Sequence, residues 1–332
     1  MRILVTGGCG FIGSNFVRFL LGHYQPLLVT NVDALTYAGN VENTSGVAED
    51  FGDRYEFFQA DIADASAMRE ILAKQKYYAV VNFAAESHVD RSILSSQNFV
   101  HSNVMGVNVL LELCREFQVK RFLQISTDEV YGDHSGEAPF TENTPLNPSS
   151  PYSASKASAD ILVMAAAKTY GQEVIITRCT NNYGSFQHPE KFIPRAITQA
   201  LSDDSLPVYG DGAQRRDWLH VHDHCRALQA ILLEGRAGEI YNISAGHELS
   251  NLELAKQIVQ KLGKPESLIR HVTDRRGHDR RYFISSEKLS RKLDWKPNYD
   301  FKIGLEETLQ WYQTHRDWWE PKRKDLLQTL PS

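Results

Sequence analysis

The sequence contains no apolar run that approaches the roughly 20 residues needed to cross a membrane as a helix. Its 332 residues are 42% hydrophobic and 23% charged, which is the composition of an ordinary globular protein. The chain begins MRILVTGG and enters a predicted strand at once, so we expect no signal peptide. These features predict a protein of the cytoplasm with no membrane partner.

Cysteine and clustered positive charge are also scarce. The four cysteines, Cys9, Cys114, Cys179 and Cys225, show neither CxxC spacing nor a paired framework, so we expect reduced thiols in a reducing compartment. The net charge is -5 and no long Lys/Arg run is present. This argues against a nucleic-acid partner, because binding a phosphate backbone needs a positive stripe. Small anionic substrates remain compatible with local arginines.

Short apolar segments alternate with amphipathic helical segments through the first half of the chain. We predict strands over residues 2–7, 27–33, 55–61, 79–85, 119–126 and 173–180. The helices predicted between them cover residues 13–24, 63–76, 97–117 and 152–171. Several of the strands are nearly continuous apolar runs, as parallel strands covered on both faces require. The rhythm predicts an α/β fold with a doubly wound parallel (Rossmann) sheet.

After residue 180 the pattern loosens into loops rich in Gly, Pro, Asn and Arg, with shorter helices and no internal repeat. We predict a nucleotide-binding domain over residues 1–180 and a smaller, loop-rich lobe over residues 181–332. A segment near residues 220–245 is expected to return to the first domain, with EIYNIS adding a strand to the sheet. Binding residues tend to lie on loops such as those of the second lobe.

A glycine-rich turn, TGGCGFIG, connects the first strand to the first helix. It contains Gly8-x-Gly10-x-x-Gly13 and also Gly7-x-x-Gly10-x-x-Gly13, and such glycines let the backbone approach a pyrophosphate at the helix N-terminus. Asp33 ends the second strand, 20 residues after Gly13, where its carboxylate can bind ribose hydroxyls and repel a 2′-phosphate. The context predicts NAD rather than NADP, against the alternative of an incidental turn followed by a surface acid.

Tyr152 and Lys156 lie four residues apart and therefore share one face of a predicted helix. A lysine beside a phenol lowers the phenol pKa, which lets a tyrosine act as a base. Alone this spacing is common on helix surfaces, but here it accompanies the nucleotide motif and Thr127. The acids Asp128 and Glu129 follow at the end of an apolar strand, where the simplest alternative is a solvated turn.

Several longer stretches match one known family over nearly the whole chain. They read TGGCGFIGSN, VDALTYAGN, NFAAESHVDRSI, STDEVYG, SPYSASKASAD, TRCTNNYG, HPEKFIPR, YGDGAQRRDWLHV and GHDRRY. Together they resemble the extended short-chain dehydrogenase/reductase superfamily and, within it, the dTDP-glucose 4,6-dehydratases. Cys9 stands where this family commonly has Ala, and Arg276 where a Pro is frequent, which could alter the substrate loop.

The resemblance implies a lyase that converts dTDP-glucose to dTDP-4-keto-6-deoxyglucose and water. Tyr152 would take the 4-hydroxyl proton while NAD⁺ receives the C4 hydride, with Thr127 hydrogen-bonding that oxygen and Lys156 holding the ribose. Glu129 would then remove the C5 proton, Asp128 would protonate the departing C6 hydroxyl, and the hydride would return to C6. The product would supply deoxysugar biosynthesis, including that of dTDP-rhamnose.

The same resemblance implies two sets of binding residues and a homodimer. The cofactor set is Gly7, Gly10, Phe11, Ile12, Gly13, Asp33, Ala34, Leu35, Thr36, Asp61, Ile62, Ala84, Ala85, Ser87, Ser102, Tyr152, Lys156 and Asn182. The substrate set is Ser87, Thr127, Asn181, Lys191, Phe192, Pro207, Val208, Tyr209, Arg216, Asn251, Asp274, Arg275 and His278. Arg216 is the best candidate for the diphosphate, because a guanidinium fork suits phosphate oxygens. The dimer would form through the helix of residues 97–117 and the helix of Tyr152.

Physical chemistry adds two expectations for the adjacent acids. Asp128 and Glu129 must reach different atoms of one sugar, so the backbone there should leave regular strand geometry. Coupled carboxyl groups in a site closed to water should also have separated protonation states, with one kept neutral as the acid.

Two further patterns are better explained by structure than by chemistry. His220, His222 and His224 alternate and would share one face of a strand, which suggests a metal site. We favour neighbouring histidines without a metal, with Asp223 at a helix start. The pair Trp318-Trp319 is expected to serve C-terminal packing rather than base stacking.

Three alternatives remain open from the sequence. A nucleotide-sugar 4-epimerase would need Tyr152 and Lys156 but not the Asp-Glu pair. A 4,6-dehydratase for a UDP- or CDP-sugar would require only small changes around residues 207–209, whereas GDP-mannose dehydratases carry Ser-Glu and generally favour NADP. A non-catalytic NAD-sensing protein on the same fold has usually lost the Tyr or the Lys.

Overall fold

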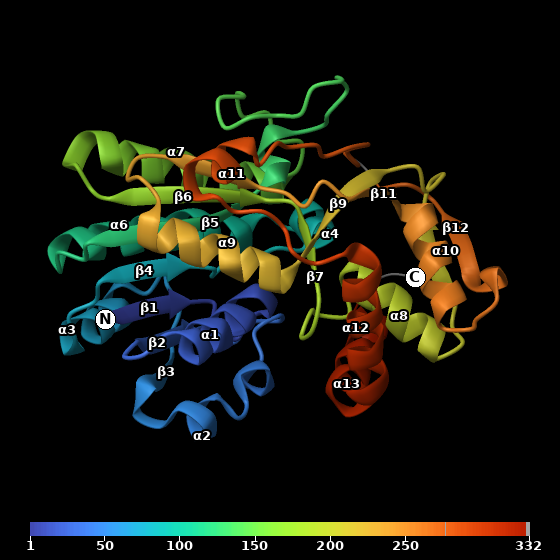
Figure 1. The fold of residues 1–332 in the computed structure, drawn as a ribbon, viewed down its shortest axis with the longest axis horizontal. Helices are drawn as coiled ribbons and strands as arrows, with labels where there is room; N and C mark the ends of the chain where they lie inside the picture. The colour runs from blue at the N-terminus through green and yellow to red at the C-terminus, as the bar shows by residue number, and fades with distance from the viewer. Residues whose placement is uncertain (276, 330–332) are drawn as a thin grey trace.

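The computed structural model describes residues 1–275 and 277–329, and within them seven strands form one parallel sheet (Figure 1). The strands are β1 (Arg2–Thr6), β2 (Leu28–Asp33), β3 (Tyr55–Gln59), β4 (Ala79–Asn82), β5 (Arg121–Thr127), β6 (Val174–Cys179) and β10 (Ile240–Ile243). Their order is β10-β6-β5-β4-β1-β2-β3, so the direction of winding reverses between β1 and β4. This confirms the doubly wound sheet, and β10 is the strand expected from EIYNIS.

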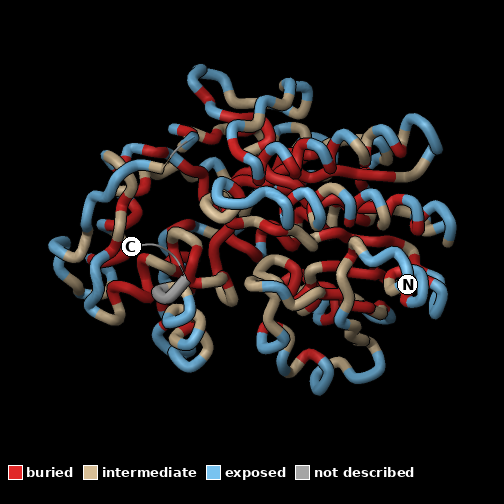
Figure 2. The backbone as a smooth tube through the Cα atoms, turned by 180° about the vertical axis from the view of Figure 1, so that it is seen from behind, coloured by how far each residue is buried: buried red, intermediate tan, exposed pale blue. Residues whose placement is uncertain are grey.

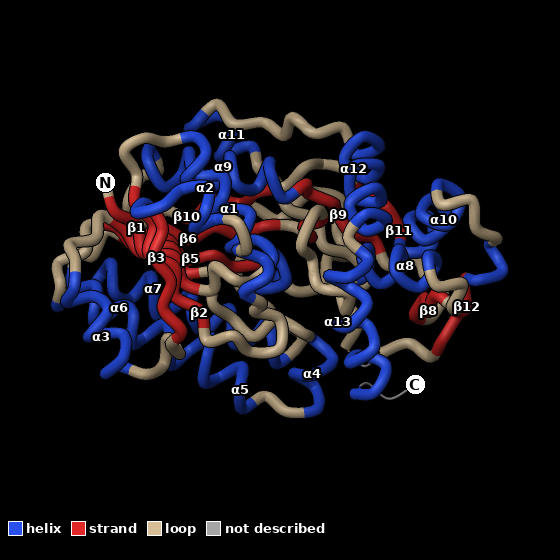
Figure 3. The backbone as a smooth tube through the Cα atoms, turned by 90° about the horizontal axis from the view of Figure 1, so that it is seen from below, coloured by secondary structure: helices blue, strands red, loops and turns tan. Residues whose placement is uncertain are grey.

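Helices cover both faces of this sheet (Figure 3). One face packs against α1 (Phe11–His23), α9 (Val221–Glu234) and α11 (Glu287–Leu293). The other packs against α3 (Ala65–Lys74), α6 (Gly106–Glu116) and α7 (Pro151–Tyr170). The strands therefore form the buried centre of this part of the molecule, as Figure 2 shows, which explains their continuous apolar sequences.

The helix of Tyr152 has strong local signals at both ends. Ser150 precedes it and exchanges hydrogen bonds with Ser153, the hydroxyl of each accepting from the backbone N–H of the other. Pro151 occupies the first helical position, where its missing N–H costs nothing, and Gly171 ends the helix in the left-handed conformation. The start of α7 is thereby fixed, and with it the positions of Tyr152 and Lys156.

The predicted helix over residues 97–117 contains an irregular turn. It is built from α5 (Gln97–Val100), the π-helical segment η3 (His101–Met105) and α6, which follow one another without a break. Single π-helical turns inside α-helices frequently mark functional positions, because they rotate a side chain away from the regular helical face. In this chain the turn carries the buried residue Asn103.

The second lobe has its own small sheets and core. It contains β7 (Asn181–Tyr183), β8 (Leu206–Tyr209), β9 (Arg215–His220), β11 (Glu248–Ser250), β12 (Ile269–Val272), α8 (Phe192–Leu201), α10 (Asn251–Lys261), α12 (Phe301–Thr314) and α13 (Arg316–Thr329). Trp319 is fully buried in the core of this lobe, and its Nε1 donates to the backbone oxygen of Tyr312 over 2.7 Å. The expected packing role of this tryptophan is confirmed.

The remaining short helical elements connect the strands and longer helices along the chain. They are η1 (Val41–Thr44), α2 (Val47–Phe51), η2 (Gly52–Arg54), α4 (Val89–Leu94), η4 (Asp128–Tyr131) and η5 (Glu266–Leu268). Among the helices in the part of the chain that the structure describes, none combines the length and the apolar character of a membrane span.

A second return to the first sheet was not anticipated. Leu289 on α11 and Trp295 after it are buried against the face that α1 and α9 cover, so the chain crosses back near residues 287–295 as well as at residues 220–245. No sequence pattern predicts this return, because α11 is only seven residues long. The proposed domain boundary at residue 180 stays a prediction.

Candidate active site

The site lies at the carboxyl ends of β1, β4, β5 and β6, where open parallel sheets place their ligands. Three cavities there share lining residues. The central cavity, about 280 Å³, extends from the glycine-rich turn to Trp218. The β2 cavity, about 90 Å³, lies beside Asp33, and the lobe cavity, about 160 Å³, is lined by residues such as Arg216. The central cavity adjoins both others, so one extended ligand could occupy neighbouring spaces.

The glycine-rich turn is packed so closely that side chains would not fit. Gly7 has φ +69°, and a Cβ atom there would lie 2.5 Å from the backbone nitrogen of Ala84. A Cβ on Gly13 would lie 2.2 Å from the backbone oxygen of Gly7. Among the described residues no side chain caps the start of α1, so its first N–H groups face the cavities. This arrangement suits a pyrophosphate.

Asp33 is held in a fixed orientation at the edge of the β2 cavity. Its Oδ2 accepts from the backbone N–H of Cys9 over 2.9 Å and its Oδ1 accepts from that of Leu35 over 2.8 Å. Burial raises the pKa of Asp33, and these two N–H groups act against that rise. The Cys9 side chain, which departs from the family pattern, is fully buried and accepts from Asn31 Nδ2 over 3.4 Å. The departure therefore lies outside the cavities.

The strand that carries the two acids ends abruptly, as expected. β5 stops at Thr127, and Asp128 begins the 3₁₀ turn η4. Thr127 caps this turn, because its Oγ1 accepts from the backbone N–H of Glu129 over 3.2 Å and donates to Asp128 Oδ1 over 3.2 Å. Gly132 closes the turn with φ +81°. The turn brings both acids to the wall of the central cavity instead of to opposite faces of a strand.

The two acids differ in electrostatic environment. Asp128 is only 3% exposed, and burial together with the neighbouring Glu129 raises its pKa well above the usual range. Its Oδ2 has no hydrogen-bond partner among the described residues. Burial also raises the pKa of Glu129, but the cations Arg275, Arg216 and Lys191 oppose that rise. The environment thus favours protonation more strongly at Asp128 than at Glu129, in line with the expected separation of their protonation states.

Tyr152 and Lys156 both lie on the wall of the central cavity, but one prediction about them is wrong. Lys156 Nζ donates to the backbone oxygen of Ile125 over 2.7 Å. The phenol pKa is raised well above its usual range, first by burial and then by Glu129 and nearby groups. The expected lowering of this pKa by Lys156 is absent, because burial and negative charge outweigh any effect of the ammonium group.

Most predicted binding residues line the three cavities. Those on the central cavity are Gly7, Gly10, Phe11, Ile12, Gly13, Ala85, Ser87, Thr127, Tyr152, Lys156, Asn181, Asn182, Lys191 and Phe192. The β2 cavity adds Asp33, Ala34, Thr36, Asp61, Ile62, Ala84 and Ser102. The lobe cavity adds Pro207, Tyr209, Arg216, Asn251, Arg275 and His278. Their individual binding roles stay predictions.

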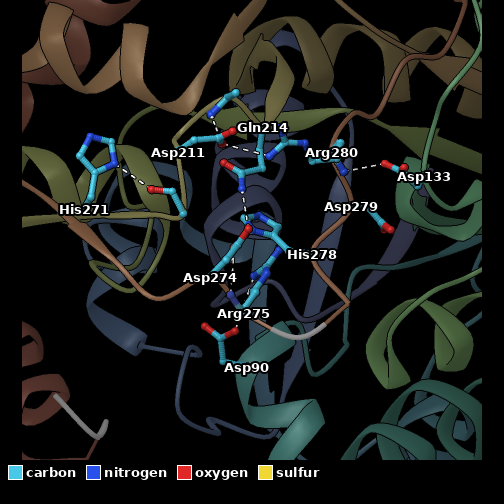
Figure 4. A network of polar contacts seen from close by, with 12 residues as sticks. Asp90, Asp133, Asp211, Gln214, His271, Asp274, Arg275, His278, Asp279 and Arg280 are labelled. Carbon is cyan, nitrogen blue, oxygen red and sulfur yellow. Dashed lines mark hydrogen bonds and ion pairs between the residues drawn. The ribbon is translucent and has the colours of Figure 1, made fainter.

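Three predicted residues, Leu35, Val208 and Asp274, line none of these cavities. Val208 is fully buried in the core of the second lobe, because alternate residues of β8 point inward. Asp274 instead accepts hydrogen bonds from His278 Nδ1 over 2.6 Å and from Gln214 Nε2 over 3.0 Å (Figure 4). It supports His278, which does reach the lobe cavity. Arg276 lies outside the described residues.

Two ion pairs between distant parts of the chain, here called the rim, lie on the lobe cavity or next to residues that line it (Figure 4). Arg275 pairs with Asp90 over 3.6 Å. The two terminal guanidinium nitrogens of Arg280 each donate to one carboxylate oxygen of Asp211 over 3.0 Å. Below the rim, Arg216 is buried and donates to the backbone oxygen of Asp279 over 2.9 Å. Arg216, the residue predicted to bind the diphosphate, is thereby held by the backbone of Asp279 and Arg280.

Two buried polar residues at the site were not singled out from the sequence. Asn103 donates to the backbone oxygen of Glu86 over 3.0 Å and to Ser155 Oγ over 2.8 Å, so it ties the loop after β4 to α7. The sequence feature that could have identified Asn103 is a polar residue within the predicted helix over residues 97–117. Glu190 lines both the central and the lobe cavities with a fully buried side chain near His88 and Lys191. The sequence feature that could have identified Glu190 is its position next to Lys191, a predicted substrate residue.

The alternating histidines do not share one strand face. β9 ends at His220, and α9 begins at Val221 with Asp223 in its first turn, which confirms the expected helix start. His224 is fully buried and contacts Asn182 Oδ1 over 2.8 Å. Within residues 1–275 and 277–329, no cluster of three or more His, Cys, Asp or Glu side chains could hold a metal ion.

Known proteins match this chain over nearly its full length. The family model described as GDP-mannose 4,6 dehydratase matches residues 4–308. A dTDP-glucose 4,6-dehydratase from Streptomyces niveus is 49% identical over 325 residues, which are 97% of this chain and 95% of that protein. The chain belongs to the dTDP-glucose 4,6-dehydratases of the extended short-chain dehydrogenase/reductase superfamily.

Solved structures separate two branches of this superfamily. DesIV, a dTDP-glucose 4,6-dehydratase from Streptomyces venezuelae with NAD bound, has a TM-score of 0.94 and 48% identity, covering 97% of this chain and all of its own. A UDP-glucose 4-epimerase from Thermotoga maritima with UDP-glucose has a TM-score of 0.87 but 29% identity, covering 95% and 99%. The fold is common to both, whereas the sequence favours the dTDP-glucose 4,6-dehydratases over the epimerase alternative.

Proposed function

We propose that this chain is an NAD-dependent hydro-lyase that converts dTDP-glucose to dTDP-4-keto-6-deoxyglucose and water. The observation that carries the proposal is that Asp128 and Glu129, on one 3₁₀ turn, share the wall of the central cavity with Tyr152 and Lys156. An epimerase needs only the tyrosine and the lysine. A paired acid and base suit an elimination.

The residues beside β1 and β2 fit a dinucleotide. The glycine-rich turn leaves room for a pyrophosphate at the start of α1, and Asp33 presents a fixed carboxylate for ribose hydroxyls. The same carboxylate disfavours a 2′-phosphate, which supports NAD over NADP. When bound, NAD⁺ supplies the redox chemistry by accepting the C4 hydride and returning it to C6.

In the first half of the reaction, Tyr152 accepts the proton of the sugar 4-hydroxyl. Negative charge on Glu129 and Asp128 opposes formation of a phenolate, so the neutral form of Asp128 favours this step by removing one of the charges. Thr127 hydrogen-bonds the same sugar oxygen, and the ammonium group of Lys156 stabilises the phenolate form of Tyr152 that accepts the proton. The C4–H bond breaks as the C4 carbonyl forms.

In the second half, the new C4 ketone acidifies the proton on C5. Glu129 removes that proton, and Asp128 delivers its own proton to the C6 hydroxyl, which leaves as water while a C5–C6 double bond forms. Return of the hydride to C6 and of a proton to C5 completes the product. The raised pKa of Asp128 favours the protonated form that this step requires, because a buried carboxylate resists ionisation.

The lobe cavity is the proposed place for the nucleotide part of the substrate. Arg216, Arg275 and Lys191 supply positive charge for a diphosphate, and Pro207 and Tyr209 line the same space. We propose dTDP as the nucleotide because relatives that are 48–49% identical to this chain are named dTDP-glucose 4,6-dehydratases. A UDP- or CDP-sugar would use the same charged residues.

We also propose that the chain works as a homodimer in the cytoplasm, with a product that feeds deoxysugar synthesis such as that of dTDP-rhamnose. Large apolar side chains are exposed on α4, η3 and α7, namely Leu94, Met105 and Ile161. Burying these side chains between two copies would remove apolar surface from water. Light scattering tests the dimer, and a monomer would contradict it.

The reaction is tested by incubating the purified chain with dTDP-, UDP-, CDP- and GDP-hexoses and measuring the product masses by mass spectrometry. We expect a ketosugar lighter by one water from dTDP-glucose, and no such product from an Asp128→Asn/Glu129→Gln double variant. Faster conversion of a UDP- or CDP-hexose than of dTDP-glucose would contradict the proposal that dTDP is the nucleotide. An epimer of unchanged mass would replace the dehydratase by a 4-epimerase.

A further inference from the structure

A chain of buried polar side chains runs behind Lys156 and is not used by the reaction steps described above. Asp160 Oδ2 accepts from Arg178 Nε over 2.9 Å, and Arg178 Nη1 donates to the Tyr131 hydroxyl over 2.8 Å. That hydroxyl donates to Asn242 Oδ1 over 2.9 Å. These four side chains, here called the Asp160 network, are each no more than 3% exposed.

The Asp160 network joins the two elements that carry the reactive groups. Asp160 lies on α7, one helical turn after Lys156, and Tyr131 lies at the end of η4, the turn of Asp128 and Glu129. Arg178, on β6, bonds to both. The Arg178 guanidinium also lies over the Tyr131 ring, 4.8 Å from its centre. One arginine thus links the helix of the base to the turn of the acid pair.

A buried ion pair needs an explanation, because desolvating two charges costs about as much as their attraction returns. Apolar side chains would fill the same space without that cost. The charge of Asp160 also acts on Lys156, one helical turn away on α7. Burial lowers the pKa of Lys156, and the negative charge of Asp160 is the largest opposing effect.

The other groups around Lys156 do not replace this contribution. Arg178 on β6 is itself a cation, and the thiol of Cys179 on the same strand is neutral at ordinary pH because burial raises its pKa to about 12. Asp128, on η4, is favoured in its neutral form, and Tyr152 on α7 carries a phenol with a raised pKa. Burial raises the pKa of Asp160 as well, but the charge of Arg178 and its hydrogen bond oppose that rise, so Asp160 is the acid on α7 whose ionised form is stabilised by a cation one helical turn from Lys156.

We propose, on the basis of the proposed dehydratase function, that Asp160 is a positioning residue that acts through Lys156. Held by Arg178, its carboxylate keeps the Lys156 ammonium group charged inside the protein. The same arginine fixes the turn of Asp128 and Glu129 through the Tyr131 hydroxyl. The network thereby couples the charge needed for C4 oxidation to the geometry needed for loss of water.

The first test is the Asp160→Asn variant, whose side-chain oxygen can still accept from Arg178. Without the negative charge, Lys156 should lose its proton at lower pH. We expect the alkaline limb of the kcat profile to move down by about one pH unit, with KM for the sugar nucleotide unchanged within about twofold. An unmoved limb would overturn the proposal.

The second test removes only a hydroxyl and keeps the core filled. In Tyr131→Phe, Arg178 and Asn242 lose their common partner, so the turn of the acid pair loses an anchor. We expect kcat to fall about tenfold, with water loss slowed more than hydride transfer and the alkaline limb unmoved. Tyr77→Phe is the matched control, because the buried Tyr77 hydroxyl donates to Thr30 on β2, away from the acids. Equal kinetic losses in both variants would assign Tyr131 a purely structural role.

A third readout is independent of the substrate. In full-length protein with ¹⁵N-labelled lysine, the side-chain signal lost in Lys156→Met identifies Lys156, and its titration is compared between wild type and Asp160→Asn. We expect a lower midpoint in the variant, whichever sugar nucleotide the protein uses. An unchanged midpoint would refute the role of Asp160 alone, whereas a wild type inactive on dTDP-glucose would refute only the proposed substrate and reaction. If Asp160→Asn does not fold, Tyr131→Phe still decides the coupling to the acid turn.

Discussion

The central cavity and the rim of the lobe cavity both contain acidic and basic residues, but in different surroundings. In the central cavity, Asp128 and Lys156 are almost fully buried, and regular elements or their capped ends hold them. At the rim, Arg280 and Asp211 pair with more than half of each side chain exposed. Burial shifts the pKa of the first two groups, whereas solvent screens the rim pair. We therefore expect substitutions in the central cavity to change chemistry and rim substitutions to change little.

The largest effect is expected for Tyr152→Phe, because it removes the proposed base while the buried ring still fills its space. We expect kcat to fall about 10³-fold, in line with the loss of a general base. The overall rate is measured with dTDP-glucose, and circular dichroism checks the fold. Activity within about tenfold of wild type would remove Tyr152 from the mechanism.

The next effect is expected for Asp128→Asn, which separates the two halves of the reaction. C4 oxidation should remain within about threefold of wild type, while water loss slows about 10²-fold because the proton donor is lost. Stopped-flow traces should therefore show that NADH accumulates in the variant, because it forms at nearly the wild-type rate but is consumed only after water loss. Equal slowing of both steps would contradict the division of labour between Asp128 and Glu129.

The same variant tests the pKa of Asp128 through stability. Since folding raises this pKa, the wild-type carboxyl favours the folded state only while it is protonated, and this contribution is lost as pH rises through the folded-state pKa. Asp128→Asn should therefore gain Tm relative to wild type between acidic and neutral pH. A difference in Tm that does not vary with pH would contradict the raised pKa.

An intermediate effect is expected for Asp33→Asn at the β2 cavity. The amide retains one acceptor but removes the charge that favours two ribose hydroxyls, so the Kd for NAD should rise about tenfold. Calorimetry on protein stripped of nucleotide measures this, with NADP as the comparison ligand. NAD affinity equal to wild type would remove Asp33 from the cofactor site.

The smallest effect is expected for Arg280→Ala on the rim (Figure 4). Its contact with Asp211 is exposed, so kcat should not change and KM for dTDP-glucose should change by less than about twofold. Steady-state kinetics at low and high salt provide the measurement. A tenfold change in KM would contradict the expectation that substitutions at the rim change the kinetics little.

The elements with strong local signals could be predicted from the sequence. The apolar strands, the glycine-rich turn and the Ser-Pro start of α7 each specify structure within about ten residues, and they place Tyr152 and Lys156. The departure from strand geometry at Asp128 and Glu129 followed from the need for two acids to reach one ligand, although the predicted strand ended one residue before β5 does. These predictions work because neighbouring residues supply the interactions.

Other features depend on partners that are distant in the chain. Arg178 meets Asp160 and Tyr131 only when β5, β6 and α7 have assembled. Burial dominates the pKa of Tyr152, which the spacing to Lys156 could not show. Likewise, the inward orientation of Val208 depends on the register of β8 beside β12, which no local pattern specifies.

The most direct test follows a deuterium atom placed on C4 of dTDP-glucose. If the hydride is stored and returned within one cavity, the purified product carries deuterium on C6 and, in ordinary water, hydrogen on C5, as read by NMR. Deuterium remaining on C4, or lost to solvent before it reaches C6, would contradict the proposed oxidation, elimination and return.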